Sequence, residues 1–162
     1  MSDASFAELA KARRNWKDEH LNLYLRSGGA EGHVMDVTDI GGHRFTTMLL
    51  LRYVGRKSGK TMITPLIYGD IGGEVVIVAS KGGADHHPAW YLNVKDREEL
   101  SFQIATQAYR ATWREPRAAE RGKVWDFMVS VFPPFAKYQL STTREIPLVM
   151  MSAIGPTDRF KA

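Results

Sequence analysis

The spacing of apolar residues changes from a helical period to a strand-like pattern after about thirty residues. From Asp3 to about Arg26, apolar residues recur every three to four positions among basic side chains, which predicts an amphipathic helix. The glycine-rich stretch 27–32 cannot sustain that period and ends the helix. We therefore predict an N-terminal unit over residues 1–32, consisting of a helix and a glycine-rich link, and a main domain over residues 33–162.

Three later segments are dense in β-branched, aromatic and other apolar residues, which predicts strands at Phe45–Val54, Thr61–Tyr68 and Glu74–Ala79. The breaks between them, Gly55–Lys60 and Asp70–Gly73, are short and contain turn residues. Short breaks favour antiparallel hairpins, because a crossover to a parallel strand needs a dozen residues or more. We expect a meander or a barrel.

Prolines mark the boundaries of the remaining elements, because proline suits a first helical turn and interrupts a helix interior. The expected fold class is mainly β with flanking helices. The remaining predicted elements are a helix from Pro88 to Leu100, a hairpin of Ser101–Thr106 with Tyr109–Trp113, a helix opened by Pro116 and stopped by Pro133-Pro134, and a last strand Glu145–Met151.

Composition indicates a folded globular domain and excludes several kinds of chemistry. Hydrophobic residues make up 44% of the 162 residues and charged residues 25%. The chain has no cysteine, which excludes disulfides, thiol nucleophiles, iron–sulfur clusters and cysteine-bound zinc. Redox chemistry would therefore need a bound cofactor. The N-terminus lacks a basic-then-apolar leader and the longest apolar run, Met48–Leu51, is far too short to span a bilayer, so we expect the cytoplasm.

The formal charge of +4 is compatible with nucleic acid, acidic lipid or an anionic small molecule. The basic residues are scattered and form no nucleic-acid-binding motif, so we expect no nucleic-acid partner. Trp16 stands among basic neighbours in the N-terminal helix. That composition fits a helix that makes peripheral membrane contact or acts as a lid, and it equally fits a surface helix packed on the core.

One basic turn stands out as a candidate anion site, Gly55-Arg56-Lys57-Ser58-Gly59-Lys60. Its cations and backbone N–H groups suit a phosphate, although a solvated basic turn has the same composition. It is not a nucleotide-hydrolysing P-loop, because only three residues separate the glycines and a strand follows. A metal site at Asp85-His86-His87 is not expected, because neighbouring histidines on an extended segment point in opposite directions.

Taken in order, the motifs of the chain resemble those of the deazaflavin-dependent nitroreductase and quinone reductase family. The similarity runs from about Thr46 to Met151. The motifs that carry it are G-R-K-S-G-K at 55–60, T-P-L at 64–66, A-S-K-G-G at 79–83, H-P-A-W-Y-L-N at 87–93, P-P-F-A-K-Y-Q at 133–139 and R-E-I-P at 144–147.

The resemblance implies a split β-barrel related to FMN-binding oxidoreductases. It also implies that reduced coenzyme F-420, an 8-hydroxy-5-deazaflavin, donates hydride to a small-molecule acceptor such as an apolar quinone, an enone or a nitroaromatic compound. The protein would act mainly by orienting the acceptor against the cofactor. Two alternatives stay open: a split-barrel reductase that uses FMN, and a non-catalytic protein that binds the cofactor or a lipid.

The resemblance also assigns roles to residues. Arg56, Lys57 and Ser58 would hold the acidic phosphate and tail of the cofactor. Phe135 and Tyr138 would close over its ring and face the acceptor, and Tyr138, Ser80 or water would deliver a proton. The ring and linker would be lined by Met62, Ile63, Thr64, Pro65, Leu66, Ile67, Val78, Ala79, Ser80, Lys81, Ala89, Trp90, Tyr91 and Asn93.

This chain departs from the family pattern beside the double proline. Relatives commonly carry tyrosines on both sides of it, whereas this chain has Phe132 and Phe135, and Tyr138 supplies the remaining hydroxyl. We therefore expect an acceptor wall that is more apolar than usual.

Overall fold

A computed structural model describes residues 16–161 of the chain. The N-terminal helix is described over residues 16–26, and the rest of its predicted range lies outside the described residues. The other elements are β1 (Val34–Met35), the 3-10 helix η1 (Thr38–Ile40), β2 (Thr46–Val54), β3 (Thr61–Ile71), β4 (Glu74–Val78), the 3-10 helix η2 (Lys81–Gly83), α2 (Ala89–Val94), β5 (Glu99–Ile104), β6 (Gln107–Arg114), α3 (Ala118–Val131), α4 (Pro134–Leu140) and β7 (Leu148–Thr157).

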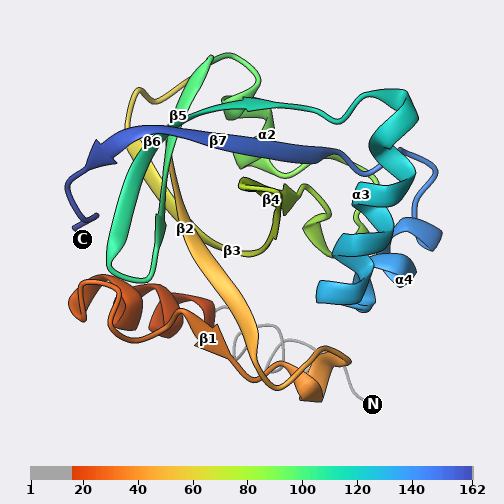
Figure 1. Cartoon of the computed structure of the whole chain (residues 1–162), viewed down its shortest axis with the longest axis horizontal. Coiled ribbons are helices and arrows are strands. Elements are labelled where there is room, and N and C mark those ends of the chain that lie inside the picture. Colours follow the sequence, from red (N-terminus) through yellow and green to blue (C-terminus); the bar gives the residue numbers. More distant parts are fainter. Residues whose placement is uncertain (1–15, 162) are drawn as a thin grey trace.

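Six strands close into an antiparallel barrel (Figure 1). The strand order is β2-β3-β4-β7-β6-β5, and a further pairing of β5 with β2 closes the circle. The short β1 pairs with the start of β2. The prediction of a mainly β fold with flanking helices, arranged as a split barrel, is therefore confirmed.

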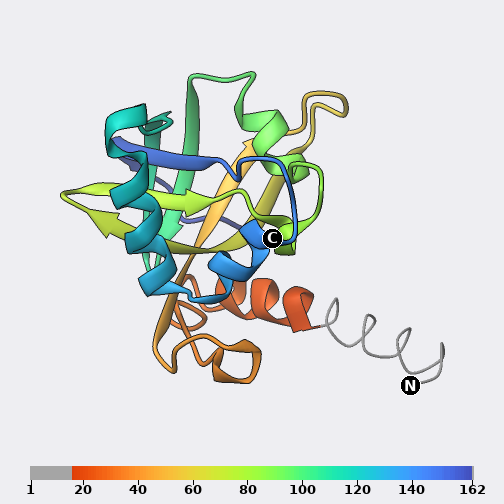
Figure 2. The ribbon, with the colours of Figure 1, turned by 90° about the vertical axis from the view of Figure 1, so that its right-hand side faces the viewer.

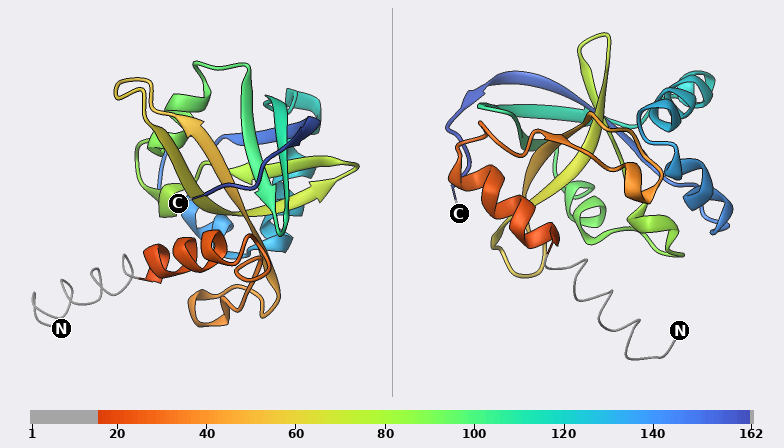
Figure 3. Two further views of the ribbon diagram at one scale, coloured as in Figure 1. Left: turned by 90° about the vertical axis from the view of Figure 1, so that its left-hand side faces the viewer. Right: turned by 90° about the horizontal axis from the view of Figure 1, so that it is seen from below.

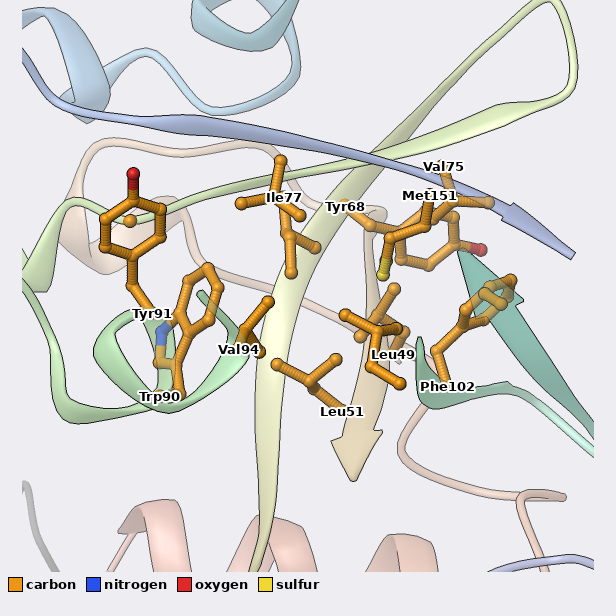
Figure 4. Close-up of a cluster of buried hydrophobic side chains, with 14 residues drawn as sticks. Leu49, Leu51, Tyr68, Val75, Ile77, Trp90, Tyr91, Val94, Phe102 and Met151 are labelled. Carbon is orange, nitrogen blue, oxygen red and sulfur yellow. The ribbon is translucent and has the colours of Figure 1, made fainter. Parts of the chain in front are cut away.

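Alternation along the strands separates a barrel interior from an outer surface. On β4, Val75 and Ile77 point inward, whereas Val76 and Val78 point outward. The interior is filled by side chains from every barrel strand and by Trp90 and Tyr91 of α2, which close one end (Figure 4). The barrel is therefore a packed core and not a pore.

Helices cover two separate parts of the outer surface (Figures 2 and 3). The helices α3 and α4 cover the outward residues of β4 and β7, with Met128 and Phe135 among the buried contacts. The N-terminal helix covers a different part through Tyr24, which packs with Leu50 and Phe160. Among the described residues, no helix combines the length and apolar character needed to cross a bilayer.

Several predicted boundaries were wrong, including the end of the second strand, because β3 runs three residues past Tyr68 to Ile71. The helix after Pro88 ends at Val94, because Leu100 is needed as an inward residue of β5, where it is buried. Pro134 does not only stop α3 but begins α4, a position that proline suits. The last strand starts at Leu148, after a proline that cannot donate to a ladder, and runs six residues past Met151 to Thr157.

Candidate functional site

Hydrogen bonds of the Asn93 side chain link the basic turn to α2. The turn closes on itself, because Gly55 N–H donates to Lys60 O at 2.8 Å. Arg56 N–H donates to Asn93 Oδ1 at 2.6 Å, and Asn93 Nδ2 donates to Ala89 O at 2.8 Å. The structure thus brings together two sequence-distant segments that were predicted to bind the cofactor. Arg56 and Lys57 stay exposed and are available to an anion.

The outer face of β3 forms a strip between the two helical regions. Ile63 packs against the cluster under the N-terminal helix, and Ile67 packs against the cluster under α3 and α4. Pro65 lies between them and is half-buried. Leu66 points the other way and packs in the barrel interior. The predicted segment Met62–Ile67 therefore does not present all its side chains to one ligand, because alternate residues lie on opposite faces.

The segment after β4 has a backbone conformation that is uncommon outside glycine. Lys81 has φ +47°, and it is followed by Gly82 at +63° and Gly83 at +85°. A non-glycine residue with positive φ is held there by its surroundings, and such positions cluster at functional sites. Ser80, which precedes it, is only 8% exposed. The Lys81 ammonium lies 2.6 Å from His86 Nε2.

Arg144 fixes this segment in place. Its guanidinium donates to three backbone carbonyls, Ala79 O at 3.2 Å, Ser80 O at 2.8 Å and Ala84 O at 2.8 Å. The same group lies 2.9 Å from His87 Nδ1. The R-E-I-P motif alone does not indicate this role for Arg144. The missing information was spatial, because the carbonyls that it binds lie about sixty residues earlier in the chain.

The electrostatics of this contact favour a neutral His87. Burial lowers the pKa of the His87 ring, and the nearby charges of Arg144 and Lys95 lower it further, against an opposing effect of Glu115. An arginine is always a donor, so Nδ1 of His87 has to be the acceptor in this hydrogen bond. Protonation of His87 would place a second cation against the guanidinium.

The aromatic corner docks onto the same segment. Phe132 and Phe135 are 3% and 5% exposed, and Tyr138 packs its ring on both at centroid distances of 6.3 Å. Gly83 lies against the backbone of Tyr138, and its carbonyl accepts a hydrogen bond from Ser141 at 3.0 Å. Tyr138 and Ser80, the two candidate catalytic residues, are thus carried by segments that contact each other. Phe135 is core, so Tyr138 is the more accessible member of the predicted pair.

The side chains of Trp90 and Tyr91 attach α2 to the barrel. Their side chains are 6% and 3% exposed and pack inside the barrel (Figure 4). Tyr91 also donates its hydroxyl to Glu115. Because their own rings are buried, they would contribute to a surface site only by fixing the position of α2, which carries Asn93 and the exposed Ala89.

Two pockets lie in the described part of the chain. One, of about 200 Å³, is beside Arg52 and Ser101, and the other, of about 560 Å³, is beside Phe45 and Phe127. Neither is lined by a predicted cofactor-binding residue. We call the exposed and half-buried predicted residues on the basic turn, α2, the Lys81 segment and Tyr138 the band. Leu66, Ala79, Trp90, Tyr91 and Phe135 pack in the hydrophobic clusters and are not part of it.

A closed antiparallel barrel with a basic turn and an aromatic corner is the arrangement that the motifs imply for a split-barrel oxidoreductase. Comparison with known families makes this specific: the family model for F420H(2)-dependent quinone reductase matches residues 16–153. The chain belongs to this family. It is therefore an F-420-dependent oxidoreductase with the reduced deazaflavin as hydride donor, as the motifs predicted.

Individual relatives agree with this assignment. The F420H(2)-dependent quinone reductase Rv1261c of Mycobacterium tuberculosis is 29% identical over 149 residues, which covers 85% of this chain and 95% of the relative. A solved F420-H2 dependent reductase, FDR-A, is 38% identical with a TM-score of 0.60, covering 65% of this chain and 93% of that chain. A solved structure described as a domain-swapped dimer is 34% identical with a TM-score of 0.63, covering 86% and 99%.

The residues present fit this cofactor. Exposed cations on a turn of fixed shape suit an acidic phosphate and tail. The half-buried Pro65 between Ile63 and Ile67 offers a flat apolar surface to a ring. An added Cβ on Gly82 would meet no atom within 4 Å, so the backbone there is open to close approach.

Proposed function

We propose that this protein binds reduced coenzyme F-420 along the band from the basic turn to Tyr138 and catalyses reduction of an apolar quinone there. The bound cofactor supplies the hydride, and the protein orients the two reactants and excludes water. The observation that carries this proposal is the pair of Asn93 hydrogen bonds, which joins the basic turn to α2. That contact fixes the cations relative to the band on which the ring would lie.

The aromatic corner supports an apolar acceptor. Phe132 and Phe135 are buried and have no hydroxyl, and Tyr138 supplies the single phenol of the corner. A missing neutral hydrogen bond to the acceptor costs about 0.5–1.5 kcal/mol. That deficit disfavours a strongly polar nitro compound more than a lipophilic quinone or an enone. Tyr138 is our candidate proton donor, with Ser80 and water as the alternatives.

The experiment is a titration of the full chain with reduced coenzyme F-420 and, separately, with FMN, followed by turnover with a quinone, an enone and a nitroaromatic. The double variant Arg56→Ala/Lys57→Ala should weaken deazaflavin binding by about tenfold or more and flatten its salt dependence. The matched control is Arg26→Ala/Lys123→Ala, which removes two exposed cations far from the band in sequence. Cofactor affinity should be unchanged in the control.

Each rival predicts a different result. Tighter binding of FMN than of the deazaflavin would assign the barrel to a flavin user. Deazaflavin binding without oxidation by any acceptor would make the protein a binder. Equal loss of affinity in the double variant and its control would remove the basic turn from the site.

Peripheral membrane contact of the N-terminal helix stays a prediction, as does a cytoplasmic location. Tyr24 and His20 face the protein and are buried, whereas Trp16 is 40% exposed. Contact with acidic lipid would therefore involve the Trp16 end of the helix. Co-sedimentation of the full chain and of Trp16→Ala with anionic liposomes tests this, and equal recovery of both would contradict it.

A further inference from the structure

The barrel has an opening where β2 and β5 separate. The two strands pair only as far as Arg52 and Ser101. Beyond that point β2 continues beside β3 alone, and β5 continues beside β6 alone. The pocket of about 200 Å³ lies in this opening. It is lined by Arg52, Tyr53, Val54, Thr61, Val94, Arg97, Glu99, Leu100, Ser101 and Arg110.

Strand register places two arginines on either side of a serine. Arg52 pairs with Ser101 across β2 and β5, and Ser101 pairs with Arg110 across β5 and β6. Residues directly opposite in antiparallel strands point to the same face, and neighbouring strands lie about 4.8 Å apart. The side chains of Arg52 and Arg110 therefore leave the barrel on either side of Ser101 and on the same, outer face.

The pocket carries an excess of positive charge. Three of its lining residues are arginines, Arg52, Arg97 and Arg110, and one is an acid, Glu99, so three minus one leaves a charge of +2. The pair of Arg110 with Glu99 is long, at 3.4 Å, and about half exposed on both sides. Such a pair neutralises Arg110 weakly.

The Arg52 guanidinium is held by a contact that leaves its charge free for a ligand. The Arg52 guanidinium stacks over the Phe160 ring at 4.3 Å, which fixes its position. The backbone of Arg97 is fixed because its carbonyl accepts a hydrogen bond from Trp113 Nε1 at 2.8 Å. Groups held in place before binding lose less entropy when a ligand arrives.

We propose that the opening between β2 and β5 is a binding site for a compact oxyanion, a phosphate or carboxylate group. Guanidinium groups bind both bidentately, and the Ser101 and Thr61 hydroxyls add donors at the same pocket. A volume of about 200 Å³ also leaves room for several bridging waters, at roughly 30 Å³ each in bulk.

Two sources could supply this chemistry. Val54 and Thr61 line the pocket and directly flank the basic turn, so an acidic group of a cofactor bound at that turn is one source. A free oxyanion is the other. The site itself does not depend on the proposed function, and only the first source rests on it.

The test is calorimetric titration of the full chain with inorganic pyrophosphate at low salt. Arg97→Ala and Arg110→Ala should each weaken binding by roughly three- to tenfold, as loss of a partly exposed charge-assisted contact does. Glu99→Gln should strengthen it, because it removes the competing carboxylate. The matched control, Arg26→Ala, should bind as the parent does.

Absence of pyrophosphate binding to the parent, or equal binding by all four variants, would overturn the proposal. Tighter binding by Glu99→Gln than by Asp126→Asn, which removes an exposed carboxylate outside the pocket, would support it even if an arginine variant folds poorly. Repeating the titration in the presence of coenzyme F-420 separates the sources. Competition identifies an acidic group of the cofactor, and additive binding identifies a free oxyanion. Failure of the proposed function would appear separately, as a parent that binds pyrophosphate but not the cofactor.

Discussion

At the scale of single residues, Arg144 holds the shape of the 79–84 segment of the candidate site through contacts that no sequence motif indicates. One guanidinium satisfies the carbonyls of Ala79, Ser80 and Ala84, three groups on a segment with little regular structure. Buried carbonyls without partners are costly, so these three hydrogen bonds help to hold the conformation of the segment. His87 is the titratable contact of this guanidinium, which links the segment to pH.

The pKa of His87 is lowered, which fixes the sign of its effect on stability. The unfolded chain, with a histidine pKa near 6.5, takes up a proton at higher pH than the folded chain does. The free energy of unfolding therefore falls as the pH drops below about 6.5. We expect His87→Gln to reduce the loss of melting temperature between about pH 7.5 and pH 5.5 by roughly 1–3 °C.

His33 provides the internal control for this measurement. Burial lowers its pKa too, and its ring lies 2.7 Å from the Tyr68 hydroxyl, away from Arg144. His33→Gln should also flatten the melting profile, but its cofactor affinity should keep the pH dependence of the parent. If the cofactor affinity of His87→Gln falls with pH as steeply as in the parent, His87 does not link the site to pH.

At the scale of elements, the contact between η2 and α4 holds the two sides of the site together. Gly83 has φ +85°, and an added Cβ would lie 2.2 Å from Ser141 Oγ and 2.9 Å from the Tyr138 backbone. We expect Gly83→Ala to lower the free energy of unfolding by about 3 kcal/mol or more, from strain plus displacement of α4. Denaturation in urea measures it.

Gly82→Ala is the matched control for that variant. Gly82 has φ +63° but no atom within 4 Å of an added Cβ, so only backbone strain of roughly 1–2 kcal/mol is expected. Equal destabilisation by the two substitutions would show that the contact with α4 contributes nothing. Activity with a quinone should fall in Gly83→Ala beyond what its stability explains, because Tyr138 moves.

Local patterns were sufficient to predict most strands but not the ends of every element. The hairpin from β3 to β4 was predictable, because β-branched residues flank two glycines in a tight turn. The end of α2 was not, because only the closed barrel requires Leu100 in a strand. At the site, the basic turn and Tyr138 could be selected from motifs, whereas the Asn93 and Arg144 hydrogen bonds join residues far apart in sequence.

At the scale of the whole molecule, both ends of the described chain are fastened to the same side of the barrel. Phe160 N–H donates to the side-chain oxygen Oε1 of Gln103 at 2.7 Å. The backbone carbonyl of Gln103 accepts a hydrogen bond from the Tyr24 hydroxyl at 3.3 Å. Both Tyr24 and Phe160 pack on Leu50. Residues 16–26 therefore contribute to the barrel's hydrophobic surface, and the division between units 1–32 and 33–162 stays a prediction.

The same arrangement predicts that the Tyr24 hydroxyl is important for global stability. It accepts a hydrogen bond from Ala105 N–H at 2.8 Å, and its single hydrogen is shared between Met48 O at 3.1 Å and Gln103 O at 3.3 Å. Burial raises its pKa to about 12, so it stays protonated. Tyr24→Phe keeps the ring but leaves the Ala105 N–H without its acceptor. We expect the free energy of unfolding to fall by about 1–3 kcal/mol, measured by urea denaturation.

Tyr109→Phe is the matched control for Tyr24→Phe, because it also removes one tyrosine hydroxyl. Tyr109 is half-buried in the barrel interior, and its hydroxyl makes no hydrogen bond to the residues that the structure describes, so its removal should change stability by less than about 0.5 kcal/mol. A loss in Tyr24→Phe no greater than in Tyr109→Phe would show that the N-terminal helix is attached by apolar packing alone. A larger loss would show that its hydrogen bonds to β2 and β5 contribute to the stability of the barrel.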